Sequence, residues 1–145
     1  MEELINSPNR VIHFPTQKYI DLPVFYQMAD LCIFPKQCSL SFYDAQACGL
    51  PVIAEDNNIN IERLMHKNGY VFKAEDVNDL RNKILMMVEL SKKEYQVVSK
   101  NAYKFVINNY DYENIAKKYT EVMLNQYKNF TENKISKLNH VIKEE

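Results

Sequence analysis

Glycine is nearly absent from this chain: only Gly49 and Gly69 occur among its 145 residues. Phosphate-binding loops of the G-x-G-x-x-G or P-loop kind need several glycines close together, so both kinds are excluded. Cysteine is also scarce, and Cys32, Cys38 and Cys48 lack the C-x-x-C spacing of common metal sites. We therefore expect free thiols in a reducing compartment, without a disulfide framework or a bound metal.

An excess of charge of one sign and long apolar runs are missing as well. The 18 basic residues balance 19 acidic ones, so the charge gives no indication of nucleic-acid binding. No apolar run approaches the roughly 18 residues of a membrane span. The acidic Met1-Glu2-Glu3 start does not resemble a signal peptide. We expect a cytoplasmic protein, and peripheral contact with the inner face of the membrane remains open.

Short apolar runs alternate with helical patterns in the first half of the chain. The predicted strands are Val11–Phe14, Leu31–Phe34, Pro51–Ala54 and Tyr70–Phe72. Helices are predicted from Asp21 onward, over Phe42–Cys48 and over Ile61–Met65, the last with Ile61, Leu64 and Met65 as its apolar face. Beyond Asp76 the pattern is wholly helical. Strands joined by helices indicate an α/β fold with a parallel sheet, followed by C-terminal helices.

The chain shows no repeat and no linker that would indicate a second domain. We expect residues 1–127 to form one unit. Residues 128–145 are rich in charge and keep helix formers with a sparse apolar stripe. This end is either a helical or frayed tail in solvent or a segment that docks on an absent partner.

The stretch Leu31–Ala54 is predicted to form a strand, a loop, a helix and a second strand. Ligands of parallel sheets bind at the carboxyl ends of strands, and here that end is the loop Lys36–Ser41. The loop leads into a helix start, whose free amides suit a phosphate. Ser41 and Asp44 also fit a capping box, in which Ser41 accepts from the third helical amide and Asp44 from the cap amide.

Four motifs follow one another in a defined order. They are Ala29-Asp30 before a strand, the stretch Asp44–Val52, the stretch Asn68–Val71, and Tyr110-Asp111-Tyr112. Together they resemble the C-terminal, nucleotide-sugar-binding part of retaining GT-B glycosyltransferases of the group 1 type, over about residues 11–127. The resemblance implies a Rossmann-like sheet, a nucleotide-sugar donor as substrate and no cofactor. It also implies a glycan acceptor of the polysaccharide, capsule or lipopolysaccharide type.

Two glutamates eight positions apart mark the donor site in that family. The second is similar in position to Asp44, which implies binding of the nucleotide ribose. The first falls on Lys36, so a hydrogen-bond donor replaces an acceptor there. Some branches carry a Pro-x-Gln-x-Ser-x-Ser pattern at this place, which is matched by Pro35, Gln37, Ser39 and Ser41. The resemblance thus implies contacts to the donor sugar and diphosphate from Lys36, Gln37, Ser39, Leu40 and Ser41.

Catalytic residues are not assigned, and Glu55 and Asp56 are further candidates to flank the donor. The family's domain begins with two strand-helix units that precede the counterpart of Val11 and carry a basic pair for the diphosphate. Neither they nor an N-terminal acceptor domain is found in this sequence. We therefore expect a fragment of a hexosyltransferase-type enzyme, inactive by itself. The alternative is a non-catalytic module that binds nucleotide weakly or serves in interactions.

Overall fold

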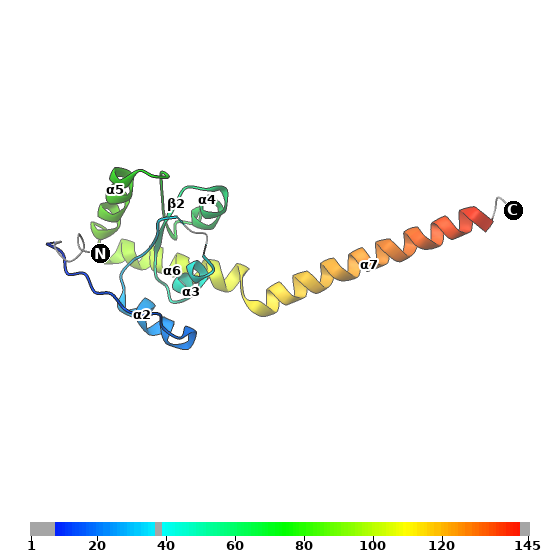
Figure 1. Ribbon diagram of the computed structural model, residues 1–145, viewed down its shortest axis with the longest axis horizontal. Helices are drawn as coiled ribbons and strands as arrows, with labels where there is room; N and C mark the ends of the chain where they lie inside the picture. Colours follow the sequence, from blue (N-terminus) through cyan, green and yellow to red (C-terminus); the bar gives the residue numbers. More distant parts are fainter. Residues whose placement is uncertain (1–7, 37–38, 143–145) are drawn as a thin grey trace.

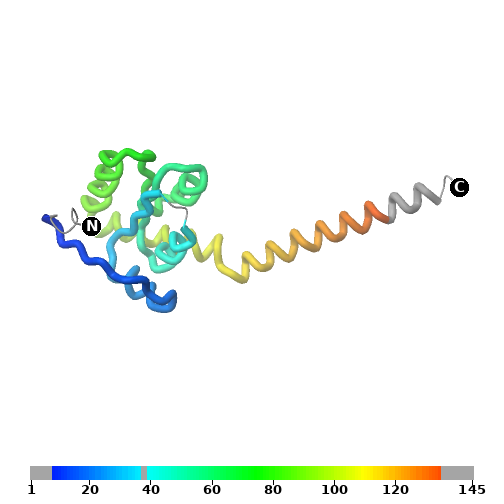
Figure 2. The backbone as a smooth tube through the Cα atoms, in the orientation of Figure 1, coloured from blue at the N-terminus to red at the C-terminus, as the bar shows by residue number. Residues whose placement is uncertain are grey.

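The computed structural model describes the backbone of residues 8–36 and 39–142, and side chains as far as Lys134. Figure 2 follows this path through the chain. Helices and short strands alternate before the chain becomes wholly helical (Figure 1). In order they are η1 Tyr19–Asp21, α2 Leu22–Met28, β1 Cys32–Phe34, α3 Ser41–Ala47, β2 Val52–Glu55, α4 Asn58–Leu64, β3 Gly69–Phe72, α5 Val77–Val88, α6 Lys92–Asn109 and α7 Tyr112–Ile142. The predicted α/β class is confirmed.

The sheet is parallel, and β2 lies between β1 and β3. Ile33 pairs with Ile53, and Ile53 pairs with Tyr70. The β2 residues Val52, Ile53 and Ala54 are all fully buried, as an apolar run without alternation predicts for a strand covered on both faces. The carboxyl ends of the three strands therefore meet at one edge of the sheet.

Helices cover β2 from two sides. Val52 and Ala54 belong to a core cluster with Phe42 of α3, Leu64 of α4 and Phe105 of α6. Ile53 points to the opposite face, because successive strand residues alternate. Figure 1 shows α5 and α4 on opposite sides of β2. The two short crossover helices and α6 thus form one layer, and α5 covers the other face.

The predicted strand Val11–Phe14 is wrong. The structure shows no strand within residues 8–18, and Val11, Ile12 and Phe14 are about half exposed. Phe14 instead packs edge to face against Phe25 of α2, with ring centroids 5.1 Å apart. A strand needs a hydrogen-bonding neighbour, and in the described part of the chain β1 has one only on its β2 side.

Helix α4 forms where it is predicted, but it buries a different face. Ile61 and Met65 are exposed, whereas Asn60, Arg63 and Leu64 are buried. Asn60 Nδ2 donates to the carbonyl of Glu55, 2.9 Å away. The polar side chains turn inward because the neighbouring elements offer them hydrogen-bonding partners, which compensates the cost of burial.

The last two helices differ in their surroundings. A capping box of Ser91 and Glu94 starts α6, which packs on α3. Helix α7 extends away from the rest of the domain (Figure 1). Its apolar side chains are between 59% and 67% exposed at Tyr119, Val122, Met123, Tyr127 and Phe130. Docking of residues 128–145 on a partner stays a prediction.

No helix in the described ranges combines the length and the apolar character needed to cross a membrane.

The two glycines allow a sharp test of the fold. Gly49 has a φ of +74°, and an added Cβ would lie 3.1 Å from Ser99 Oγ. At Gly69 an added Cβ would collide with the backbone carbonyl of Val52, between β2 and β3. We expect Gly49→Ala to lower the free energy of unfolding by about 1–2 kcal/mol, the cost of a left-handed residue. Gly69→Ala should cost about 3 kcal/mol or more, since the strands must separate. Urea denaturation of both variants measures the difference, and equal losses would contradict this geometry.

Candidate functional site

The predicted donor-binding residues lie at the carboxyl end of β1. Lys36 is exposed in the loop directly after the strand, and Leu40 is exposed just before α3. Ser39, Ser41 and Asp44 are half-buried at the start of α3. Gln37 lies outside the described residues, as does Cys38. The structure therefore brings Ser39, Leu40, Ser41 and Asp44 together on one short segment.

The predicted capping box at the start of α3 is wrong. Ser41 is the first helical residue, and the cap position belongs to Leu40, whose side chain makes no capping hydrogen bond. Ser39 takes over this role: its Oγ accepts from the Ser41 amide at 3.1 Å, and its carbonyl accepts from the Phe42 amide at 3.3 Å. Two amides predicted to face a phosphate are thus already bonded within the loop.

Asp44 bonds to a residue far away in the sequence. The hydroxyl of Tyr19, in η1, donates to Asp44 Oδ1 at 2.9 Å. This hydrogen bond and the negative charge of Asp44 raise the pKa of Tyr19. Nothing in the local sequence signals this pair, because the two residues are 25 positions apart. Within the described residues, Asp44 is therefore held by the phenol of Tyr19 and makes no capping bond at the start of its own helix.

The two carboxylates after β2 are bonded to the turn that follows β3. Asp56 Oδ1 accepts from the amide of Ala74 at 2.6 Å, and Glu55 Oε1 accepts from the amide of Glu75 at 3.4 Å. Glu75 has a φ of +59°, so this tight turn gains from both carboxylates. Glu55 and Asp56 thus shape the β3–α5 turn, which leaves them less available to a ligand than the sequence predicts.

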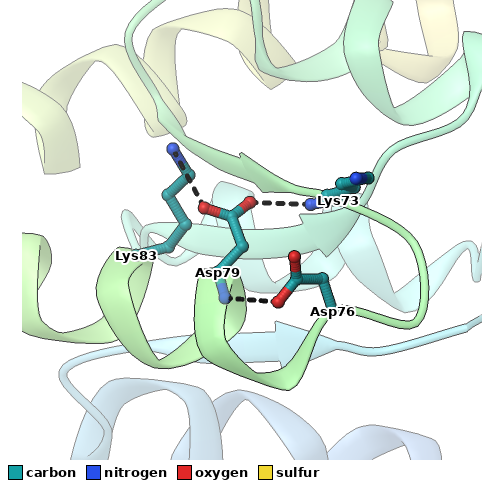
Figure 3. Close-up of polar contacts among 4 residues, drawn as sticks. All are labelled: Lys73, Asp76, Asp79 and Lys83. Atoms are coloured by element: carbon teal, nitrogen blue, oxygen red, sulfur yellow. Dashed lines mark hydrogen bonds and ion pairs between the residues drawn. The ribbon is translucent and has the colours of Figure 1, made fainter.

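Acidic side chains also organise the start of α5, as Figure 3 shows. Asp79 Oδ2 accepts from the amide of Lys73 at 2.8 Å, and Asp79 Oδ1 lies 3.8 Å from Lys83 Nζ. Asp76 caps the helix by accepting from the Asp79 amide at 2.9 Å. These contacts join β3 to α5 and give the acidic residues at this place a structural role.

The thiols show no nucleophilic character in the described residues. Cys32 and Cys48 are both free. Burial raises the pKa of Cys32 to about 11 and also raises the pKa of Cys48, so both are protonated at neutral pH. Residues 8–36 and 39–142 contain no group of three histidine, cysteine, aspartate or glutamate side chains arranged to hold a metal.

Arg63 is a residue that sequence reasoning missed. Its side chain is 8% exposed, and its Nε donates to the hydroxyl of Tyr43 at 2.9 Å. Nη1 points to the carbonyl of Ser39 at 3.5 Å, and the guanidinium lies over the rings of Phe42 and Tyr43. The sequence feature that could have indicated its burial is the spacing of positions 60, 63 and 64, which share one helical face. The apolar Ile61 and Met65 favoured another face.

Two of the sequence motifs meet in the core. Gln46 Nε2 donates to the Asn68 carbonyl at 3.0 Å, and Asn68 Nδ2 donates to Gln46 Oε1 at 2.9 Å. Both side chains are fully buried. Asn68 Nδ2 also donates to the carbonyl of Arg63 at 2.9 Å. These bonds fix the position of α3, and with it Asp44, relative to α4 and β3.

Comparisons with known proteins agree with this arrangement. The family described as Glycosyl transferases group 1 matches residues 3–105. Sucrose-phosphate synthase from Thermosynechococcus elongatus is similar in structure over 72% of this chain and 27% of its own, with a TM-score of 0.63 and 24% identity. The C-terminal domain of a glycosyl transferase group 1 family protein, LpcC, from Francisella tularensis matches 70% of this chain and 53% of its own, with a TM-score of 0.58 and 23% identity.

At such low identity the structural likeness shows the fold alone, and it confirms the predicted Rossmann-like sheet of a GT-B C-terminal domain. The chain spans about a quarter of the first of these structures and about half of the second. No curated protein matches the chain.

The pair of Tyr19 and Asp44 can be tested by titration. Tyr19 donates to a carboxylate, which favours the protonated phenol, so the pKa of Tyr19 lies above its ordinary value. Asp44→Asn removes the charge, and we expect the pKa of Tyr19 to fall toward that ordinary value. NMR of ¹³C-labelled tyrosines measures it, with Tyr19→Phe to assign the signal. An unchanged pKa in Asp44→Asn would show that the two side chains do not interact in solution.

Proposed function

Since the chain belongs to the group 1 glycosyl transferases, we propose that it provides the nucleotide-sugar-binding part of an enzyme that transfers a sugar to a glycan acceptor. The observation that supports this most is the place of Asp44. It lies on the first helix after β1, beside a loop at the carboxyl edge of a parallel sheet, where such folds bind their ligands. Its carboxylate is half-buried, and among the described residues its hydrogen-bond partner is the phenol of Tyr19.

In the proposed complex Asp44 accepts hydrogen bonds from the ribose hydroxyls of the nucleotide. Binding of the ribose would displace the hydroxyl of Tyr19, which occupies Asp44 Oδ1 in the free chain. Bonds from two hydroxyls to a carboxylate are charge-assisted and stronger than one neutral pair. In this proposal the hydroxyl of Tyr19 holds the Asp44 carboxylate in position in the absence of nucleotide, and the ribose replaces it on binding.

The loop after β1 contacts the donor sugar and diphosphate in this proposal. The exposed Lys36 adds a positive charge, which suits a diphosphate. Ser39 and Leu40 contribute backbone amides, because the amides of Ser41 and Phe42 already bond to Ser39. Gln37 belongs to the proposed set by its place in the sequence. No metal or other cofactor takes part in the proposal.

The chemistry that follows is mostly positioning and stabilisation of the departing diphosphate. We propose a retaining transfer of the hexosyl type, with a polysaccharide, capsule or lipopolysaccharide acceptor bound by a separate N-terminal domain. The place of action would be the cytoplasm, at the inner face of the membrane when the acceptor is lipid-linked.

The competing proposal is a non-catalytic module. The exposed apolar side chains of α7 favour interaction as part of its role.

Nucleotide titration tests the role of Asp44. UDP, GDP and ADP are titrated in turn into the 145-residue chain by calorimetry, and the tightest is used with the variants. Asp44→Asn should weaken its binding by roughly 1–3 kcal/mol, the usual size for hydrogen bonds to a charged group. Stability should change by less than about 1 kcal/mol, because Asp44 does not cap α3.

Tyr19→Phe is the matched control. It removes the phenol that competes for Asp44 but leaves the carboxylate, so nucleotide affinity should stay equal or rise. Unchanged affinity in Asp44→Asn, or an equal loss in Tyr19→Phe, would exclude the ribose role. Failure of the unmodified chain to bind any of the three nucleotides would argue against the proposal as a whole.

A second experiment separates binding from catalysis. The 145-residue chain should bind nucleotide and yet hydrolyse or transfer no sugar from the matching nucleotide sugar. Without a second domain the donor site stays open to water and lacks an acceptor site. Turnover is measured as nucleoside diphosphate released, with heat-denatured chain as the blank. Release clearly above that blank would contradict the expected dependence on another domain.

A further inference from the structure

Arg63 carries a buried charge that has no partner of opposite charge among the described residues. Its side chain is 8% exposed in the last turn of α4. Within the described residues the ion pair of Lys83 with Asp79 is the single one, so no carboxylate lies within salt-bridge distance of Arg63. Burying a guanidinium in this way is costly and needs compensation from hydrogen bonds and ring faces. Such a cost indicates a role that an apolar side chain cannot fill.

Within the described residues, the hydrogen bonds and ring contacts of the guanidinium involve one segment. Nε donates to the Tyr43 hydroxyl at 2.9 Å, and Nη1 approaches the Ser39 carbonyl at 3.5 Å. The guanidinium carbon lies 4.6 Å from the ring centroid of Tyr43 and 5.2 Å from that of Phe42. Arg63 thus contacts Ser39 in the loop after β1, and it also contacts Phe42 and Tyr43 in the first turn of α3.

A second aromatic residue packs against the same segment. The ring of Tyr110, at the end of α6, lies 4.3 Å from the ring of Tyr43. Burial and a hydrogen bond with Tyr43 raise the pKa of Tyr110 to about 12, so this phenol stays protonated at physiological pH. Tyr43 therefore contacts both Arg63 of α4 and Tyr110 at the α6–α7 junction.

We propose that Arg63 is a positioning residue for the donor site, which fixes Ser39 and Tyr43 so that the loop amides and Asp44 fit a nucleoside diphosphate. This inference rests on the proposed function and extends it to a specific residue. Lysine cannot replace arginine here, because the contacts use two nitrogens of a planar group that also stacks on rings. A purely structural role would affect unfolding and leave nucleotide affinity unchanged.

The test compares Arg63→Lys, Arg63→Met and Tyr43→Phe, with Arg81→Met as a control at an exposed arginine of α5. Each folded variant is titrated with the nucleoside diphosphate that the unmodified chain binds best. We expect about a tenfold loss of affinity, or about 1.4 kcal/mol, in both Arg63 variants and a smaller loss in Tyr43→Phe. Arg81→Met should bind as the unmodified chain does.

The double variant Arg63→Met with Tyr43→Phe shows whether the two residues act together. Its loss should be smaller than the sum of the two single losses, because both changes break the contact between Arg63 and Tyr43. Full affinity in a folded Arg63→Met, or losses that simply add, would overturn the inference.

Hydrogen exchange at the Ser41 and Phe42 amides gives a readout that does not need a ligand. Both amides bond to Ser39, so release of Ser39 in Arg63→Met should speed their exchange relative to the β2 amides. Unchanged exchange would also overturn the inference. If the unmodified chain binds no nucleotide, the proposed function fails, and this measurement still decides whether Arg63 positions the loop.

Discussion

The burial of β2 is the constraint on which the rest of the structure depends. It is the central strand of the sheet, with parallel partners on both sides and no exposure at Val52, Ile53 or Ala54. Its backbone groups are paired within the sheet, and both of its faces need a helical layer. The crossover helices α3 and α4 supply one layer, and α5 the other. The carboxyl end of β1 is thereby set beside the start of α3, where the candidate site lies.

Polar side chains inside the crossover layer give that site its shape. Gln46 and Asn68 join α3 to the start of β3, while Arg63 joins α4 to the first turn of α3. A buried polar group that lost its partner would pay the full cost of desolvation, so such contacts allow few alternative arrangements. Asp44 differs, since its partner in the described part of the chain is the exposed phenol of Tyr19, which a ligand can replace. The buried polar side chains thus have structural partners, whereas the carboxylate of Asp44 at the surface remains available to a ligand.

Much of this could be read from the sequence. The apolar runs at Leu31–Phe34 and Pro51–Ala54, with a helix between them, predicted the parallel crossover, because run length and helical spacing are local properties. The order of the motifs indicated the family, which the match over residues 3–105 confirms. The same reasoning placed Ser39, Leu40, Ser41 and Asp44 on one segment after β1. The confirmed predictions, of the crossover and of the family, share one cause, which is that each pattern lies within a few consecutive residues.

Only the tertiary structure decided which side chains have partners. Val11–Phe14 has the composition of a strand but no adjacent strand in the described chain, and a strand is stable only when paired. Ser41 lost the capping role to Ser39, and α4 turned Arg63 inward and Ile61 outward, because the neighbouring loop and rings offered contacts. The pair of Tyr19 and Asp44 spans 25 positions. The sequence alone determined the elements and the family, whereas contacts between distant segments, which no local pattern encodes, decided how the site is built.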